Sequence, residues 1–421
     1  MLNRLSIDLL VNLASLACLA VAGIALNVMI GRTYGPEALG LFNIVFAMFI
    51  FGSQFGSAGL QYSTLRHVSL SRSGRDTRLI FTSALQIVLV TSTVTIAVAV
   101  ACTPLLAVIF EIPGLSRAWL LAIPGLWCFS INKVLLAFLN GLGAMRAFAL
   151  YQSCRYLLML AAMALLVAVD VEAADITLLL TLSEATLLFL LGGHLYVLVG
   201  KLPTAPPGTA GWRKEHLRFG GLAMPSGVIA ELNTRVDVLL LGAILGSFQT
   251  GIYSVAILLA EGFGQVVFVV RNVVNPLLGP IVERRDQEAL SRLVRNIGGA
   301  TLALMMMGGA ALVAAFPLFD RYLLLGRFGD AFWPLLFLVV GLTLAGPLLV
   351  FSMILSQGGR PGVYSALMTS ILVSNIVFNL VGVYALGIVG AAIGTAISYL
   401  VGVATLVVIC RRVFGLRLSP L

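Results

Sequence analysis

Eight charged side chains lie within long apolar stretches of this sequence, and they are the groups most able to do chemistry there. The four cations and four acids are Lys133, Arg155, Arg235, Arg271, Glu184, Glu231, Asp237 and Glu261. A charge at the centre of a membrane helix costs roughly 2.5–3.5 kcal/mol, so it should face a protein interior or a water-filled cavity. Guanidinium groups suit phosphate oxygens and amides suit sugar hydroxyls. The pattern predicts a site for an anionic, hydroxyl-rich substrate.

The densest cluster of these groups occupies the segment from Met224 to Asp237. Glu231 and Arg235 are four residues apart and share one helical face, whereas Asn233 and Asp237 share another. A helix that is polar on two faces cannot lie against lipid, which predicts a central position. Pro225 and Gly227 permit a bend or unwinding, although a static kink is an equal alternative.

The predicted roles follow from side-chain type. The substrate-binding residues in a central cavity are expected to be Arg155, Arg235, Arg271, Lys133 and Asn233, and the coupling-ion or gating residues Glu231, Asp237 and Glu261. The coupling ion would be H⁺ or Na⁺. Two other interpretations stay open: some charges form interhelical pairs only, and Lys133 and Arg271 extend to the headgroups.

Composition identifies the elements that must position these residues. Hydrophobic residues make up 60% of the chain and charged residues 10%, and the mean hydropathy is +1.06. Ordinary soluble domains carry roughly 25% charged residues. Apolar runs of at least ~18 residues recur, which indicates a polytopic helical membrane protein and excludes outer-membrane barrels with their short alternating segments. The five cysteines show no CxxC spacing, so neither a disulfide framework nor a metal site is expected.

Twelve transmembrane helices are predicted, in an all-α architecture of two pseudo-symmetric six-helix lobes. Their approximate ranges are 9–30, 39–62, 79–101, 118–139, 147–169, 175–199, 219–245, 249–275, 297–319, 331–356, 362–384 and 387–410. The stretch 200–218, with three prolines, is the predicted linker. It divides an N-terminal lobe, residues 1–205, from a C-terminal lobe, residues 206–421. Two halves with six helices each insert in the same orientation.

The loop charges predict the orientation. Eighteen Lys and Arg residues lie in the loops on the side of both termini, and only Arg32, Arg117, Arg321 and Arg327 lie opposite. The positive-inside rule then places both termini in the cytoplasm, with the chain as a multi-pass protein of the bacterial cytoplasmic (inner) membrane. The net charge of +9 is explained by this topology. Nucleic acid is not an expected partner, because no basic face is interleaved with aromatic residues.

Signatures of catalysis and of cofactor binding are missing from the sequence. It has no G-x-x-x-x-G-K-[ST] motif, its three histidines have no metal-ligand spacing, and no nucleophile–base constellation can be assembled. The short far-side turns also leave little room for an active site that acts on lipid-linked sugars. The prediction is therefore a protein that is not an enzyme and uses no cofactor, apart from the coupling ion.

A turn motif occurs twice, 211 residues apart, and indicates a duplicated bundle. Gly31, Gly35 and Gly40 precede Leu41-Phe42, and Gly242, Gly246 and Gly251 precede Ile252-Tyr253. Each copy joins two apolar runs, so it predicts a tight structural turn between two membrane helices.

Three stretches carry a resemblance to a known family. They run from Gly31 to Phe42 and on into 56–60, from Asp237 to Ala256, and through Asn275-Pro276 at the end of the eighth predicted helix before a charged loop. They resemble the polysaccharide (O-antigen/oligosaccharide) flippase family, Wzx-type, of the multidrug/oligosaccharidyl-lipid/polysaccharide exporter (MOP) superfamily. This resemblance implies a MATE-like fold: a V-shaped pair of lobes around a central cavity.

The resemblance also implies a function in polysaccharide or lipopolysaccharide biosynthesis. The chain would move an undecaprenyl-pyrophosphate-linked oligosaccharide from the cytoplasmic to the periplasmic leaflet by alternating access. Membrane lipids and other polysaccharide-assembly membrane proteins are the implied partners. Lipid II flippases of the superfamily usually have two additional C-terminal helices, and drug exporters a more acidic cavity than the four cations and four acids found here. The alternatives are a cation-coupled multidrug exporter and, from another class, a membrane enzyme acting on the same lipid carrier.

Overall fold

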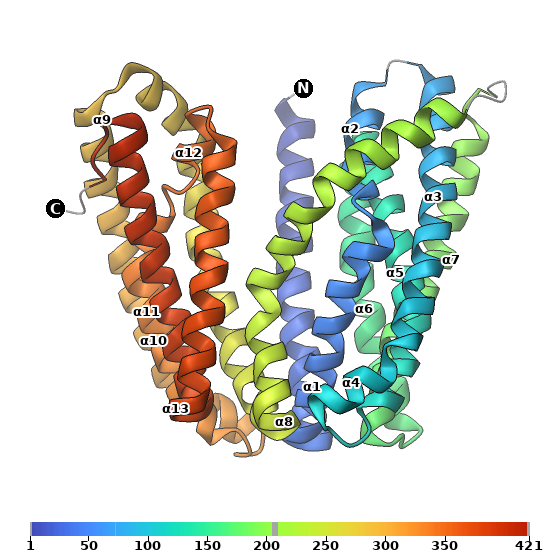
Figure 1. Ribbon diagram of the computed structural model, residues 1–421, viewed down its shortest axis with the longest axis horizontal. Coiled ribbons are helices and arrows are strands. Elements are labelled where there is room, and N and C mark those ends of the chain that lie inside the picture. Colours follow the sequence, from blue (N-terminus) through green and yellow to red (C-terminus); the bar gives the residue numbers. More distant parts are fainter. Residues whose placement is uncertain (1, 72, 204–208, 419–421) are drawn as a thin grey trace. The chain divides into compact units, whose positions relative to one another are not determined.

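The chain is a multi-pass helical membrane protein. The computed structural model describes residues 2–71, 73–203 and 209–418 (Figure 1). Within those ranges there is no β-strand, and nine helices are long and apolar enough to cross a membrane. Three of the nine are interrupted by residues with non-helical backbone angles. The parts of these three helices correspond to three pairs of predicted spans, so the all-helical prediction is confirmed.

The chain folds as two compact units, Met1–Glu231 and Leu232–Leu421. The first unit contains seven α-helices, a 3₁₀ turn and the beginning of an eighth helix. These elements are α1 (Leu2–Ser57), α2 (Leu60–Leu70), α3 (Gly74–Ala101), α4 (Thr103–Phe110), α5 (Leu115–Gly141), α6 (Met145–Ala168), η1 (Ala173–Thr177), α7 (Leu178–Gly200) and the first part of α8 (Thr209–Arg284).

The second unit begins inside α8 and includes two π-helical turns. Its other elements are α9 (Gln287–Leu293), η2 (Val294–Gly298), α10 (Gly299–Leu323), η3 (Gly329–Ala331), α11 (Phe332–Leu349), α12 (Ile354–Gln357), α13 (Pro361–Ile409) and η4 (Cys410–Phe414). The predicted lobe boundary between residues 205 and 206 lies outside the described residues.

The duplicated turn has the same backbone geometry in both copies. Gly35 has φ 88° and ψ −176°, and Gly246 has φ 79° and ψ −176°. This region of φ/ψ space is essentially restricted to glycine. The four flanking glycines of the two motifs are buried within helical segments on either side: Gly31, Gly40, Gly242 and Gly251. Only the middle glycine of each motif therefore needs the unusual conformation.

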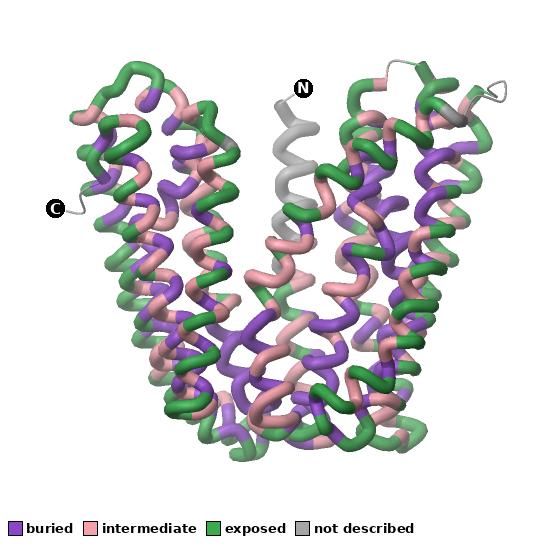
Figure 2. Tube along the Cα trace, in the orientation of Figure 1, coloured by how far each residue is buried: buried purple, intermediate pink, exposed green. Residues whose placement is uncertain are grey.

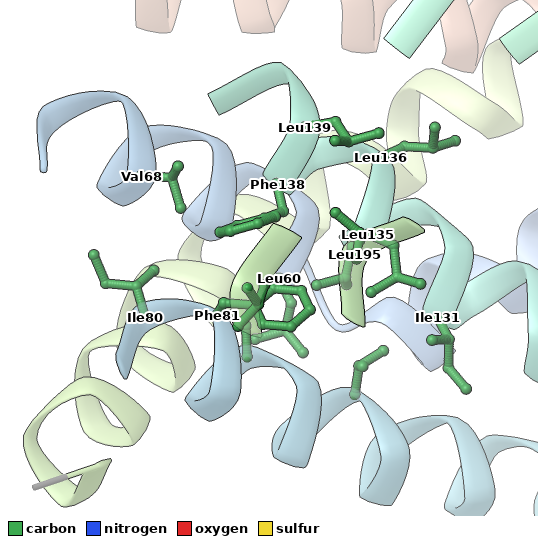
Figure 3. Close-up of a cluster of buried hydrophobic side chains, with 14 of the residues drawn as sticks. Leu60, Val68, Ile80, Phe81, Ile131, Leu135, Leu136, Phe138, Leu139 and Leu195 are labelled. Atoms are coloured by element: carbon green, nitrogen blue, oxygen red, sulfur yellow. The ribbon is translucent and has the colours of Figure 1, made fainter. Parts of the chain in front are cut away.

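Helix α5 forms the centre of the first unit. It packs against α1, α2, α3 and α7, and it is apolar on most of its circumference. Leu135, Phe138 and Leu139 belong to a cluster that also includes Phe81 of α3, with the rings of Phe81 and Phe138 4.4 Å apart (Figure 3). A Cβ atom on Gly125 would lie 2.8 Å from the backbone of Leu180, so glycine permits the close crossing of α5 and α7.

In the second unit, α11 packs along α13, and a core forms where both meet the end of α8. Phe351, Ile354 and Leu406 are fully buried in it. The tail after η4 also contributes, because Leu416 and Leu418 are each only 2% exposed. Figure 2 shows that outward-facing turns in both units are largely exposed. The outer surfaces of both units carry large apolar side chains that are exposed, such as Val94, Val98 and Val381. This is expected for surfaces that contact lipid.

The structure corrects three details of the predicted segments. The span predicted at 39–62 is divided at Ala58 and Gly59, which both have positive φ angles. Residues 209–218, predicted as linker, are the start of α8, because His216 is fully buried and hydrogen-bonded to Ser63 and the Ile80 carbonyl. Pro276 does not end the eighth predicted helix.

Helix α8 continues past Pro276 to Arg284 because its inner face stays apolar. Val274, Leu278 and Val282 are buried at helical spacing. Helical backbone angles also continue through Pro225 and Gly227, since the only non-helical residue inside α8 is Gly246. The helix is therefore not unwound below the charged cluster, which was one of the predicted possibilities.

Candidate functional site

A buried ion pair joins α6 to α7 in the first unit. The Arg155 Nε atom lies 2.7 Å from Glu184 Oε1, and the two side chains are only 11% and 3% exposed. Asn132 of α5 donates hydrogen bonds from Nδ2 to Glu184 Oε2 at 2.9 Å and to the Glu184 carbonyl at 3.0 Å. The Glu184 carboxylate is thus held by two helices. Much of the charge of Arg155 is compensated within the protein.

Lys133 is bonded differently from Arg155. Its Nζ atom donates to the Ser53 hydroxyl of α1 at 2.8 Å, and it lies 5.2 Å from the centre of the Phe129 ring. The Arg155 guanidinium lies 4.5 Å from the same ring. Both cations therefore benefit from one aromatic face. An ammonium group has three donors, so the Ser53 bond leaves donors that could reach an anionic ligand.

Glu231, at the end of the first unit, accepts a hydrogen bond from the α1 amide of Gln54. The Gln54 Nε2 to Glu231 Oε1 distance is 3.0 Å, and Gln61 Nε2 lies 3.3 Å from Gln54 Oε1. Glu231 also acts electrostatically on Lys133. Lys133 and Glu231, two predicted site residues, are therefore hydrogen-bonded to consecutive residues of α1, Ser53 and Gln54.

The second unit holds a buried carboxylate on the same long helix. Asp237 is 6% exposed, and its Oδ2 atom accepts a 2.9 Å hydrogen bond from the Tyr253 hydroxyl. Its Oδ1 atom accepts from the Val238 amide at 2.8 Å. Thr395 of α13 lies close to the Tyr253 hydroxyl. The Asp237–Tyr253 pair is therefore adjacent to a polar network on α13.

The network on α13 consists of four buried polar side chains within an otherwise apolar helix. Thr395 Oγ1 lies 3.1 Å from Asn379 Oδ1, and Asn379 Nδ2 lies 3.1 Å from Asn375 Oδ1. Asn375 Nδ2 also lies 3.4 Å from the Ser398 hydroxyl. None of these four residues is among the site residues predicted from the sequence. Their signal was the pair of amides four residues apart, Asn375 and Asn379, inside a span that should otherwise contact lipid.

The remaining predicted residues lie on α8 in the second unit. Arg235 acts electrostatically on Asp237 and on Glu261, and Tyr399 of α13 is close enough to be influenced by both acids. These three charged groups are therefore brought together. Asn233 Nδ2 lies 3.5 Å from the Met368 carbonyl, and the Arg271 guanidinium lies 5.0 Å from the Phe268 ring centre. The proposed roles of all these residues stay predictions.

A family description matches most of the chain. The family is "Polysaccharide biosynthesis protein", and the match covers residues 29–322. The chain belongs to this family. This assignment confirms the resemblance drawn from the duplicated glycine motif and from the segment after Asp237. None of the curated proteins compared with the chain matches it.

Solved structures with the same fold come from the MOP superfamily. One is described as "Lipid II flippase MurJ, inward closed conformation", with a TM-score of 0.77 and 15% identity over 95% of this chain and 87% of that one. Another is an inward-facing multidrug resistance MATE transporter of the MOP superfamily, with a TM-score of 0.73 and 18% identity over 92% of each chain. At these identities the likeness shows the fold, and the expected MATE-like fold is confirmed.

Proposed function

We propose that this family member is a flippase for a polyprenyl-pyrophosphate-linked oligosaccharide. It moves the headgroup from the cytoplasmic to the periplasmic leaflet of the bacterial inner membrane by alternating access around a central cavity. Both termini lie in the cytoplasm under this proposal. Family membership supports a role in polysaccharide assembly, and the fold shared with a lipid II flippase supports a lipid-linked substrate.

The observation that carries the substrate proposal is the bonding of Lys133. Within the described part of the chain, its partner is the neutral hydroxyl of Ser53, and no carboxylate there lies at ion-pair distance. Arg155, in contrast, is engaged by Glu184 at 2.7 Å. Lys133 is therefore better placed than Arg155 to offer donors to a pyrophosphate, whereas Arg155 and Asn132 hold the neighbouring helices. Buried amides such as Gln54 supply partners for sugar hydroxyls.

Coupling to a monovalent cation is the second part of the proposal. The supporting observation is the Asp237 carboxylate beside the oxygen-rich network of Asn375, Asn379 and Thr395. Carboxylate, amide and hydroxyl oxygens are hard ligands of the kind that alkali and alkaline-earth cations prefer. Asp237 and Glu261 would carry or exchange the ion, H⁺ or Na⁺, during the transport cycle.

An export assay tests the flippase proposal. Cells that lack the gene are complemented with the wild-type chain, Lys133→Ala or Lys133→Arg, and periplasmic glycan is quantified against cytoplasmic lipid-linked precursor. Lys133→Ala should cause precursor accumulation and at least a tenfold loss of export, and Lys133→Arg should restore part of it. Normal export by Lys133→Ala, at equal protein levels, contradicts the role of Lys133.

The other functional classes are separated by two further measurements. A multidrug exporter would change the growth inhibition caused by cationic dyes when the gene is deleted. An enzyme acting on the lipid carrier would change the chain length of lipid-linked glycan in proteoliposomes. A flippase predicts neither effect. It predicts that labelled lipid-linked oligosaccharide becomes accessible to an external lectin only in vesicles that contain the protein.

A further inference from the structure

The second unit has a groove between the end of α8 and the α9–η2 segment. Its volume is about 590 Å³, within the range of 300–1,000 Å³ found for sites that bind small molecules. Its apolar lining comes from two sequence regions on either side of the α8–α9 turn: Pro276, Leu277, Pro280, Ala289, Leu293 and Ile297.

The α8 wall of this groove is apolar and open. Pro276 and Pro280 are four residues apart, so their rings lie on one face of the helix. Both prolines are exposed, so this face presents apolar ring surface to its surroundings. Leu277 between them is 48% exposed. An exposed apolar wall at the end of a membrane-spanning helix suits the upper part of a lipid acyl chain.

The opposite wall adds a cation and an amide. Arg292 and Asn296 line the groove, are four residues apart and are both exposed. Arg292 has an ion pair with Glu288 at 3.6 Å, but the two side chains are 60% and 81% exposed. Such exposed pairs contribute little, because water and salt screen them. The Arg292 guanidinium can therefore exchange this carboxylate for a phosphate group.

The surface around the groove is strongly basic. The adjoining segments carry seven exposed arginines and only three exposed acids. The arginines are Arg284, Arg285, Arg292, Arg295, Arg411, Arg412 and Arg417, and the acids are Glu283, Asp286 and Glu288. Figure 1 shows α9 and the C-terminal end of α13 at the same end of this unit. Gln287 connects them through two hydrogen bonds to the backbone of Arg417, at 2.9 Å and 2.7 Å. The charge excess favours an anionic ligand.

We propose that this groove binds an anionic phospholipid of the surrounding membrane. An acyl chain lies along Pro276, Leu277 and Pro280, and the phosphate is held by Arg292 and Asn296. A soluble phosphate ion would leave the apolar wall uncovered, and a zwitterionic headgroup would gain less from the basic surface. The soluble ion uses only the polar part of the groove, and the zwitterionic lipid is disfavoured by its charge alone. The inference concerns the end of α8, α9 and η2, and it does not depend on the transported substrate.

Native mass spectrometry of the full-length, delipidated protein tests the proposal. Phosphatidylglycerol and phosphatidylcholine with identical acyl chains are titrated separately. We expect phosphatidylglycerol to bind more tightly and Arg292→Gln to weaken its binding about fivefold, since one arginine near an anionic lipid contributes about 1 kcal/mol. Ala289→Phe, which fills the groove, should weaken the binding of both lipids. Arg295→Gln removes the same charge outside the groove lining and is the matched control, with little expected effect.

Several results would overturn the proposal. One is equal weakening by Arg295→Gln and Arg292→Gln, which would indicate attraction to the general charge of the surface. Equal affinity for the two phospholipids is another. Tight binding of glycerol phosphate alone, or of polyprenyl phosphate in place of phosphatidylglycerol, would assign the groove to a different ligand. Thermal unfolding of each variant in detergent, with a midpoint close to wild type, shows that a loss of binding is not a loss of folding.

Discussion

The Tyr253 hydroxyl donates a 2.9 Å hydrogen bond to the buried carboxylate of Asp237. A shift of 211 residues places Phe42 and Leu26 at the equivalent positions of the first unit, and both are 2% exposed. The duplicated helices thus carry a polar pair in one unit and apolar residues at the matching places in the other. This asymmetry supports placing the proposed cation chemistry in the second unit.

Replacing Tyr253 with phenylalanine removes only the hydroxyl group. Hydrogen bonds to charged groups contribute about 1.5–3 kcal/mol, so we expect Tyr253→Phe to destabilise the protein by that amount. Export should also become less dependent on the coupling cation, because the Asp237 carboxylate loses the hydroxyl group that orients it. Unfolding curves and export assays at varied Na⁺ and pH measure the two effects. Unchanged stability and unchanged ion dependence together contradict the assignment.

The Arg155–Glu184 pair should behave as a structural pair. Breaking a buried ion pair from one side costs about 3–5 kcal/mol, whereas replacing both partners with apolar residues is often nearly neutral. We expect Arg155→Met to be strongly destabilising and Arg155→Met with Glu184→Leu to recover most of the loss. A double-mutant cycle in a denaturation assay measures the coupling.

The same variants separate the structural role of Arg155 from substrate binding. The recovered double variant should also recover export if Arg155 is structural. If the double variant is stable but does not export, the Arg155 guanidinium itself is needed for transport. That outcome would return Arg155 to the substrate-binding residues predicted from the sequence, alongside Lys133.

Alanine at Gly35 or Gly246 should be costly, because both glycines have positive φ angles with extended ψ. A residue with a Cβ atom in this region costs about 1–3 kcal/mol. Gly192→Ala in α7 is the matched control, since a Cβ atom there meets no heavy atom within 4 Å. It should be neutral or stabilise slightly. Thermal unfolding of the three variants checks the difference, and equal midpoints for all three would contradict it.

His216 should anchor the start of α8. Its ring is fully buried, with Nδ1 2.8 Å from the Ser63 hydroxyl and Nε2 3.0 Å from the Ile80 carbonyl. His216→Leu leaves both groups without this partner, so we expect destabilisation of about 2–4 kcal/mol from two unmade hydrogen bonds. Increased proteolysis between residues 203 and 219 should accompany it. Arg213→Ala, which removes only an exposed contact with Gln86, is the control.

The sequence predicted helix positions much better than lateral neighbours. Apolar run length reveals each span, and the repeated glycines reveal the duplication, because both are properties of the chain itself. The partners of Arg155 and Lys133 depend on which helices lie side by side and at what rotation. Intramembrane charge identified Glu184 as unusual, but nothing in its spacing connects it with Arg155, 29 residues earlier in the chain.

Two errors have a common physical cause. The prolines of the stretch 200–218 predict a linker that extends to residue 218, and the family resemblance implies a helix end at Asn275-Pro276. In the folded chain, burial of His216 and of Leu278 extends the helix through both places. Tertiary packing outweighed the local preference. The α13 network was missed because it contains no charged residue, and its members Thr395 and Ser398 are common in membrane helices without a special role.

The matching angles of Gly35 and Gly246 also constrain how the two halves can diverge. Helix faces can exchange apolar for polar residues, and indeed Leu26 and Phe42 of the first half correspond to Asp237 and Tyr253 of the second. No other genetically encoded residue fits a backbone with φ near 80° and ψ near 180° without strain. A complete substitution scan should therefore show two positions, 211 residues apart, that do not tolerate substitution. Most positions in the surrounding helices should tolerate it. These two glycines should therefore stay identical longest as the sequences of the two halves diverge.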